Sequence, residues 1–236
     1  MSKKNILLIV EGAKTDVRLM NNLMETYNLL DYEIVSYNTN IYTLYNQMFT
    51  DGSSYGRDLL QTLIENKNTQ KDVEILKRKY THIILCFDLD PHDEQYSKEK
   101  IQNMSEFFYE STDNGKLYIN YPMIESFSHR NGVNDNNYLT REISHKDIKD
   151  YKRIVNEFTP DPSKLIGKKS DVNQIIIQNL IKANYILYGN DNINYHVDLH
   201  KLLKYQCDKY DTTRSLFVLC TCIFFIADYN KNLILT

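Results

Sequence analysis

The sequence contains no tryptophan, no CxxC pair and no apolar run long enough to cross a membrane. Its longest apolar run, 216–227, falls short of the roughly 20 residues that a membrane-spanning helix needs. The four cysteines are scattered and three have apolar neighbours, so we expect reduced, buried packing residues. Residues 1–5 do not resemble a secretory signal. These absences predict a cytoplasmic protein with no membrane anchor.

An overall basic charge is also missing, because 28 Lys and Arg stand against 31 Asp and Glu, which gives −3. Any nucleic-acid site must therefore be a local patch. The 19 tyrosines accompany many Asn, Ile and Lys residues, so we attribute them to compositional bias and not to base stacking. With 236 residues, the chain can bury a core as one large domain or as a domain with an appendage.

An apolar stretch that ends in acids, residues 83–93, organises the rest of the chain. Its apolar part predicts a buried parallel strand, which Pro91 stops at about Asp90. Asp88 and Asp90 then lie at the carboxyl end of the strand, where open α/β sheets bind ligands. Two acids one residue apart can converge on one ion where a strand breaks, and Mg²⁺ prefers such oxygen ligands. A solvated acidic turn is the alternative.

A second apolar run, residues 5–10, predicts another buried strand that ends in Glu11 and Gly12. Gly12 permits a sharp turn, and a helical pattern follows at once. Asp16 falls in the first turn of that helix, where the helix dipole favours a carboxylate. The helix dipole is a sufficient structural reason for a carboxylate at Asp16. It does not explain the carboxylate of Glu11, which lies at the edge of the sheet.

Two more strands are expected at 33–37 and 115–121, the second of which Pro122 stops. Between the acidic strand and the last one, residues 98–109 predict a crossover helix that packs on the sheet. Glu125 follows in an apolar neighbourhood, where an unpaired carboxylate would be costly to bury. We therefore expect a cation or a basic partner beside it.

The second half of the chain loses the alternation of strands and helices. We expect helices there at 147–158, 172–188, 199–210 and 213–229. The sequence thus predicts an α/β domain at 1–130, with a mostly parallel four-stranded sheet flanked by helices and a helical insertion at about 38–80. A helical C-terminal region at 131–236 completes the chain.

The order of the acidic motifs resembles the Toprim family, whose fold topoisomerases, bacterial primases and several nucleases share. The resemblance covers roughly 5–127, and its matching residues are Val10-Glu11-Gly12, Asp16 and Asp88-Leu89-Asp90, with Glu125 where relatives carry another acid. The spacing from Glu11 to Asp16 is most similar to the small Toprim nucleases of bacterial anti-phage and abortive-infection systems. A topoisomerase tyrosine and the accessory modules of a primase are not evident, which favours cleavage over strand passage or priming.

The resemblance implies a Toprim-like, Rossmann-like fold and Mg²⁺- or Mn²⁺-dependent hydrolysis of phosphodiester bonds in DNA or RNA. Glu11 would act as general acid/base or metal ligand, and Asp88 and Asp90 would hold metal. Asp16 and Glu125 would complete the ligands. Carboxylates gathered this closely repel one another unless cations are present. Two metals about 3.5–4 Å apart could neutralise the phosphate and activate water.

The sequence gives weaker evidence for the residues that contact the substrate. Lys14 faces the first motif, and His129 and Arg130 follow Glu125 closely, so all three could contact phosphate. Four basic residues share one face of a predicted helix, as a phosphate surface or a solvated face: Lys146, Lys149, Lys152 and Arg153. By resemblance alone, a partner ATPase would hold or deliver such a nuclease. The sequence leaves a homo-oligomer and the choice between DNA and RNA open.

Two other functions are considered. Asp88-Leu89-Asp90 also resembles the first motif of haloacid-dehalogenase phosphatases, where the first Asp is a nucleophile. In those phosphatases the motif normally lies at the start of the chain and is followed by a pair of small residues. The later motif of two paired aspartates is also not found in this sequence. A catalytically inactive Toprim-like protein that docks on a partner ATPase is the other alternative, and the complete acid set argues against it.

Overall fold

A mostly parallel sheet forms the centre of the computed structural model, which describes residues 5–49, 56–66, 69–159 and 161–235. In this part of the chain the sheet has five strands in the order β2-β1-β3-β5-β4. Only the edge strand β4 runs antiparallel. The strands are β1 (Ile6–Val10), β2 (Tyr32–Ser36), β3 (His82–Asp88), β4 (Tyr109–Glu110) and β5 (Gly115–Asn120).

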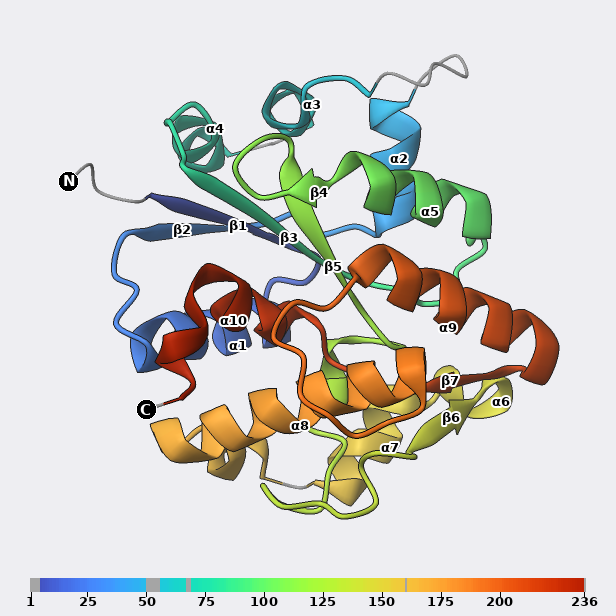
Figure 1. Ribbon diagram of the computed structural model, residues 1–236. Helices are drawn as coiled ribbons and strands as arrows, with labels where there is room; N and C mark the ends of the chain where they lie inside the picture. The colour runs from blue at the N-terminus through green and yellow to red at the C-terminus, as the bar shows by residue number, and fades with distance from the viewer. Residues whose placement is uncertain (1–4, 50–55, 67–68, 160, 236) are drawn as a thin grey trace.

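Helices cover both faces of this sheet, which explains why β1 is apolar throughout and β3 is apolar over residues 83–87. Every residue of β1 is buried. Figure 1 shows α1 (Thr15–Thr26) and α10 (Phe225–Asn230) on one side of the sheet. On the other side lie α2 (Ile41–Met48), α3 (Leu59–Glu65), α4 (Gln70–Leu76) and α5 (Lys98–Phe107). The α/β class and the mostly parallel sheet are confirmed, and α2, α3 and α4 lie in the stretch where a helical insertion was predicted.

The outermost strand on one side of the sheet, β4, was not predicted. The crossover helix ends at Phe107, and Tyr109 and Glu110 form the short strand β4, so the sheet has one strand more than expected. Phe108 is buried next to that strand and its N–H closes the last turn of α5. The aromatic residues at 107–109 suit a helix face and a strand equally, so periodicity could not separate the two.

The C-terminal region is helical in large part. Its helices are α6 (His145–Ile148), α7 (Tyr151–Phe158), α8 (Lys169–Tyr188), α9 (Leu199–Thr213) and α10. Short 3₁₀ turns connect them: η2 (Ile124–Phe127), η3 (Pro162–Leu165), η4 (Cys222–Phe224) and η5 (Lys231–Leu233). The helix predicted at 147–158 is two helices, α6 and α7, because the chain turns at Lys149 and Asp150. The domain boundary near residue 130 stays a prediction.

The helix predicted at 213–229 is wrong. Helix α9 continues through Thr213 and ends at Arg214, which has a left-handed backbone with φ 53°. The chain then forms β7 (Ser215–Phe217), which pairs antiparallel with β6 (Glu142–Ser144), before it reaches η4 and α10. An apolar run that is buried on all sides carries no period, so its sequence could not distinguish strand from helix.

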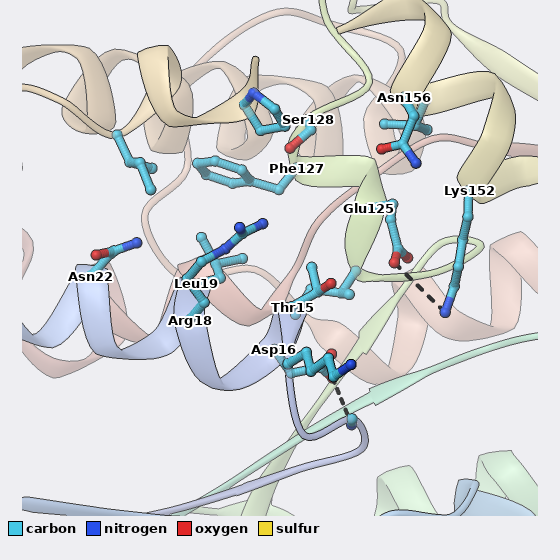
Figure 2. A pocket seen from close by; sticks show the side chains of 16 residues that line it. Thr15, Asp16, Arg18, Leu19, Asn22, Glu125, Phe127, Ser128, Lys152 and Asn156 are labelled. Carbon is cyan, nitrogen blue, oxygen red and sulfur yellow. Dashed lines mark hydrogen bonds and ion pairs between the residues drawn. The ribbon is translucent and has the colours of Figure 1, made fainter. Parts of the chain in front are cut away.

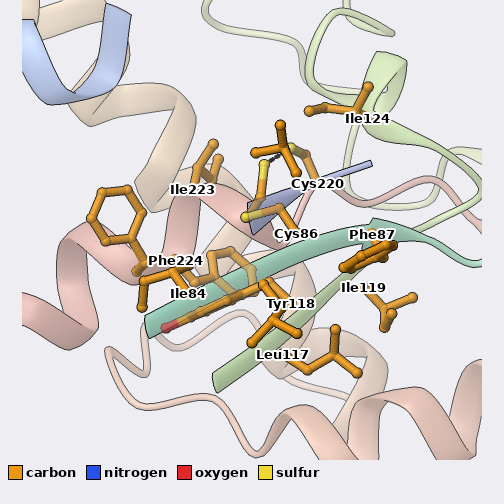
Figure 3. Close-up of a cluster of buried hydrophobic side chains, with 14 of the residues drawn as sticks. Ile84, Cys86, Phe87, Leu117, Tyr118, Ile119, Ile124, Cys220, Ile223 and Phe224 are labelled. Atoms are coloured by element: carbon orange, nitrogen blue, oxygen red, sulfur yellow. Dashed lines mark hydrogen bonds between the residues drawn. The ribbon is translucent and has the colours of Figure 1, made fainter. Parts of the chain in front are cut away.

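The segment after β7 joins the C-terminal region to the sheet. Leu219 pairs with Tyr121 through backbone hydrogen bonds of 2.8 and 2.9 Å. Figure 3 shows Ile223 and Phe224 of η4 against β3, where they pack near Cys86. The predicted burial of the cysteines is confirmed, since all four are buried and free. Among the described residues, no helix has the length and apolar character needed to span a membrane.

Candidate active site

The carboxyl ends of β1, β3 and β5 lie side by side and bring the predicted acids together. The strand register places Val10 beside Cys86 and Asp88 beside Asn120. Glu11 directly follows β1, and its Oε2 accepts a 3.1 Å hydrogen bond from the backbone N–H of Asp88. The Glu11 carboxylate therefore contacts the backbone of a residue 77 positions later in the chain, and it is near enough to the Asp88 carboxyl to raise the pKa of Asp88.

Gly12 and Asp16 form the next part of the site, at the start of α1. Asp16 Oδ1 accepts a 3.0 Å hydrogen bond from the Gly12 N–H. A Cβ at position 12 would lie 2.7 Å from Asp16 Oδ2, so glycine is needed for this close approach. Lys14 precedes α1 and its side chain does not cap the helix. Asp16 is thus held near the positive end of the helix dipole, as predicted.

Asp90 lies where β3 breaks. The strand ends at Asp88, the side chain of Leu89 is fully buried, and Asp90 adopts a left-handed backbone with φ 32°. The Asp90 N–H donates to Pro122 O at 3.2 Å, which ties this turn to the end of the neighbouring strand. The break lets Asp90 lie close enough to Glu11 to raise its pKa. An unbroken strand would have directed alternate residues to opposite faces.

Glu125 and Lys152 complete the arrangement from the other side. Glu125 lies in the 3₁₀ turn η2, beyond the end of β5. Its Oε1 lies 3.6 Å from Nζ of Lys152, which comes from α7, and its Oε2 is buried with no hydrogen-bond partner among the described residues. The basic partner expected for Glu125 is present, and the C-terminal region supplies it. Figure 2 shows this ion pair facing Asp16 across the start of α1.

The acids repel one another in a buried setting. Burial, with repulsion from Asp16 and Asp90, raises the pKa of Glu11 to about 7, although the hydrogen bond from the Asp88 N–H acts in the opposite direction. Burial also raises the pKa of Asp88 well above its ordinary value, and Glu11, Asp16 and Glu125 add to the shift. A carboxyl with a pKa near 7 can both accept and donate a proton near neutral pH. Glu11 therefore has the property of a general acid/base.

The donor set fits a hard divalent cation in its chemistry. All five acids offer carboxylate oxygens, and the unpartnered Oε2 of Glu125 is a buried acceptor that a cation would satisfy. Among the residues described, no group of three or more His, Cys, Asp or Glu side chains is already arranged to hold a metal ion.

Asn120 is a site residue that the sequence did not reveal. At the end of β5 its Nδ2 donates to Asp88 Oδ1 at 3.2 Å, while its Oδ1 accepts from the N–H groups of Thr221 and Cys222 at 3.1 and 3.2 Å. The side chain is fully buried. The sequence did place Asn120 at the end of a predicted strand, as it did the acids. That position was the one signal that could have identified Asn120 as a site residue. Asn120 orients Asp88 and fastens the C-terminal segment to the sheet.

Asn120→Leu is expected to destabilise the protein by roughly 2–6 kcal/mol, because each of the two N–H groups left buried and unpaired costs about 1–3 kcal/mol. Urea unfolding would show this as a lower midpoint with an unchanged slope. Asn192→Leu, at an exposed loop position, is the matched control and should change stability little. An unchanged midpoint for Asn120→Leu would contradict the bridging role.

His129 and Arg130 are not placed where the sequence suggested. Arg130 is fully buried, lies over the ring of Tyr138 at 4.2 Å and donates to Gln178 at 3.1 Å. His129 contacts the hydroxyl of Tyr151 at 3.1 Å, and burial lowers its pKa to about 4, so it is neutral at pH 7. Both side chains belong to the interior of the C-terminal region, which corrects the prediction that they meet phosphate. Lys14 is exposed and lines a pocket that Asp16 and Glu125 also border.

That pocket adjoins the acids and has a volume of about 400 Å³. Its walls come from α1, η2, α7 and the η3 segment, and Asp16 and Glu125 border it together with Lys152. Figure 2 shows Arg18 and Leu19 of α1 facing Phe127 and Ser128 across the space. No local sequence pattern predicted this pocket, because its walls come from segments more than a hundred residues apart.

The comparisons with known proteins add no relative. No family model matches the chain, and no curated protein or solved structure is significantly similar to it. Inferences about function therefore depend on the residues and geometry of this site and on the motif resemblance.

Proposed function

We propose that the protein is a Toprim-like, metal-dependent nuclease that hydrolyses phosphodiester bonds of DNA or RNA. The observation that carries the proposal is the meeting of Glu11 and Asp88 at the ends of adjacent parallel strands, with Asp16, Asp90 and Glu125 around them. Structural carboxylates are normally paired with cations or donors. Here five acids converge where one lysine, Lys152, is the cation that the described residues bring into contact with them.

The proposed mechanism assigns a task to each side chain. Asp88, Asp90, Asp16 and Glu125 would hold Mg²⁺ or Mn²⁺, and a cation there would supply charge neutralisation at the phosphate and Lewis acidity. Glu11 would take a proton from the attacking water or return one to the leaving oxygen, since burial and the neighbouring acids raise its pKa to about 7 before a cation binds. Lys152 is exposed and near the acids, so its ammonium group can contact a phosphate oxygen.

The test compares substrates for the wild-type protein. We expect Mg²⁺ or Mn²⁺ to support cleavage of labelled single-stranded DNA, duplex DNA or RNA, and EDTA to abolish it. A small phosphomonoester, offered in the same buffers, should remain intact. Hydrolysis of the monoester without cleavage of any polynucleotide would favour the phosphatase alternative. No activity on either class would favour the interaction protein.

The role in anti-phage defence and the partner ATPase are proposals from the motif resemblance. A partner would restrain or deliver the nuclease, since the chain carries no broad basic field of its own. Size-exclusion chromatography of the protein co-expressed with an ATPase encoded beside it tests this. The absence of a complex in every nucleotide state would contradict it.

A further inference from the structure

The pocket beside the acids has properties that the proposed hydrolysis does not require. Its volume of about 400 Å³ falls within the range of about 300–1,000 Å³ that is usual for small-molecule sites. It extends away from the carboxylates, between α1 and the η3 segment, while Asp16 and Glu125 border its inner end. A molecule bound at the acids could therefore place a side group inside it.

The walls of the pocket are mainly apolar. Leu19, Phe127 and Val155 are buried residues that line it, and Pro162 and Ile166 contribute from the η3 segment. A flat apolar group such as a nucleobase could be enclosed by these walls, and Phe127 supplies an aromatic ring there. Phosphates and sugars alone would gain little from such a lining.

Polar side chains also line this pocket, and they can form hydrogen bonds with the edge of a nucleobase. Asn22 of α1 and Asn156 of α7 both line it, and their side chains make no hydrogen bond to another described residue. Carboxamides pair with the donors and acceptors of base edges. Each side chain presents both a donor and an acceptor.

The charge at the rim matches a polynucleotide backbone. Lys14 and Arg18 line the pocket from the start of α1, and neither forms an ion pair with another residue in the described part of the chain. Lys152 stands at the opposite side, engaged with Glu125. Cations around the mouth of an apolar pocket complement phosphates that flank an inserted base.

We infer that this pocket receives one nucleobase, turned out of the stack, from the nucleotide next to the cleaved bond. The inference rests on the proposed function and names its substrate class, which is single-stranded or locally unpaired nucleic acid. A base inside a duplex would first have to leave its partner and its stack, which costs free energy that an unpaired base does not require. Stacked, paired bases cannot enter a concave site of this kind.

The experiment uses an oligonucleotide in which abasic residues replace the nucleosides around the cleaved bond. For the wild-type protein with Mn²⁺, KM should rise roughly 10-fold relative to the intact single strand, which is the size expected from the loss of one stacked base. Duplex DNA should be a poorer substrate than either of its strands. An equal KM for the intact and abasic strands would overturn the inference and leave the nuclease proposal standing.

A variant that fills the pocket provides the second arm. Asn156→Trp places a large side chain at the exposed rim and should raise KM for the intact strand roughly 10-fold, with no further rise on the abasic strand. Glu157→Trp, at the next and equally exposed position outside the lining, is the matched control and should behave as wild type. Equal KM values for both variants would contradict the inference.

A third arm separates a base in a polynucleotide from a free nucleotide. Free nucleoside monophosphates should compete with the oligonucleotide, and Asn156→Trp should weaken that competition. Tight binding of a free nucleotide that leaves cleavage unaffected would overturn the inference, because the pocket would then be a separate ligand site. Failure of the wild type to cleave any polynucleotide would instead refute the proposed function, and this inference with it.

Discussion

Glu11→Gln should reduce the rate of nucleic-acid cleavage by roughly 10²–10⁴-fold, which is the usual contribution of a general acid/base group. Asp88→Asn should also reduce it strongly, because it removes a carboxylate that would hold the cation. Glutamine at position 11 keeps the size of the side chain and can still accept from the Asp88 N–H, but it cannot exchange a proton. Asparagine at position 88 removes the negative charge while Asn120 remains beside it. Both losses should appear in kcat, because these groups act on the reacting centre.

A carboxylate of α10 that pairs with a lysine of strand β5 provides the control. Asp228 is largely buried, with 16% of its side chain exposed, and it pairs with Lys116 at 2.7 Å. The register places Lys116 beside Ile84, four residues before Asp88 along the strands. Asp228→Asn should therefore lower stability but leave kcat close to the wild-type value in the folded protein. Normal cleavage by Glu11→Gln or Asp88→Asn would remove the catalytic assignment.

The sheet and its acids were accessible from the sequence for a physical reason. Strands buried on both faces must be apolar, so β1 and β3 were recognisable, and the acids that follow them fall at the strand ends. Parallel strands put those ends at one edge of the sheet. Gly12 marked the close approach to Asp16. The order of a few local patterns thus predicted which side chains meet.

The remaining parts of the site depend on contacts between distant segments, which local patterns do not encode. Asn120 is fixed by the backbone of Thr221, 101 positions later. Lys152 was one of several lysines on a polar helix face, and its ion pair with Glu125 singles it out. Arg130 followed Glu125 closely in the sequence and was therefore placed at the site, although its side chain packs on Tyr138. Proximity in sequence was a poor guide there.

The C-terminal region is consequently part of the candidate site. It provides Lys152, one wall of the pocket and the backbone groups that hold Asn120. The apolar residues of this region and of the sheet form one buried cluster. Removal of the chain after residue 130 should therefore expose core side chains as well as dismantle the pocket. The sheet alone does not contain the site.

Stability should fall as the pH rises in the absence of divalent cations. The pKa of Glu11 is raised to about 7 in the folded protein. At pH values between the ordinary pKa of glutamate and about 7, the folded protein therefore keeps a proton that the unfolded chain has released. The free energy of unfolding then decreases with rising pH, and the shift corresponds to about 3 kcal/mol. The raised pKa values of Asp88, Asp90 and Glu125 act in the same direction. For a chain of this size we expect a Tm lower by roughly 5–10 °C at pH 8 than at pH 5.

Mn²⁺ or Mg²⁺ should reverse this loss, because a bound cation stabilises the ionised carboxylates. At 100 times its Kd, a cation adds about 2.7 kcal/mol, or roughly 5–10 °C in Tm, and the gain should be large at pH 8 and small at pH 5, where protons compete with the metal. Asp88→Asn should raise the metal-free Tm at pH 8 and abolish the response to metal, since it removes a buried charge and a ligand together. Asp228→Asn, the control, should keep the full response. Differential scanning fluorimetry at both pH values checks these outcomes, and an equal response to metal in wild type and Asp88→Asn would show that cations bind elsewhere.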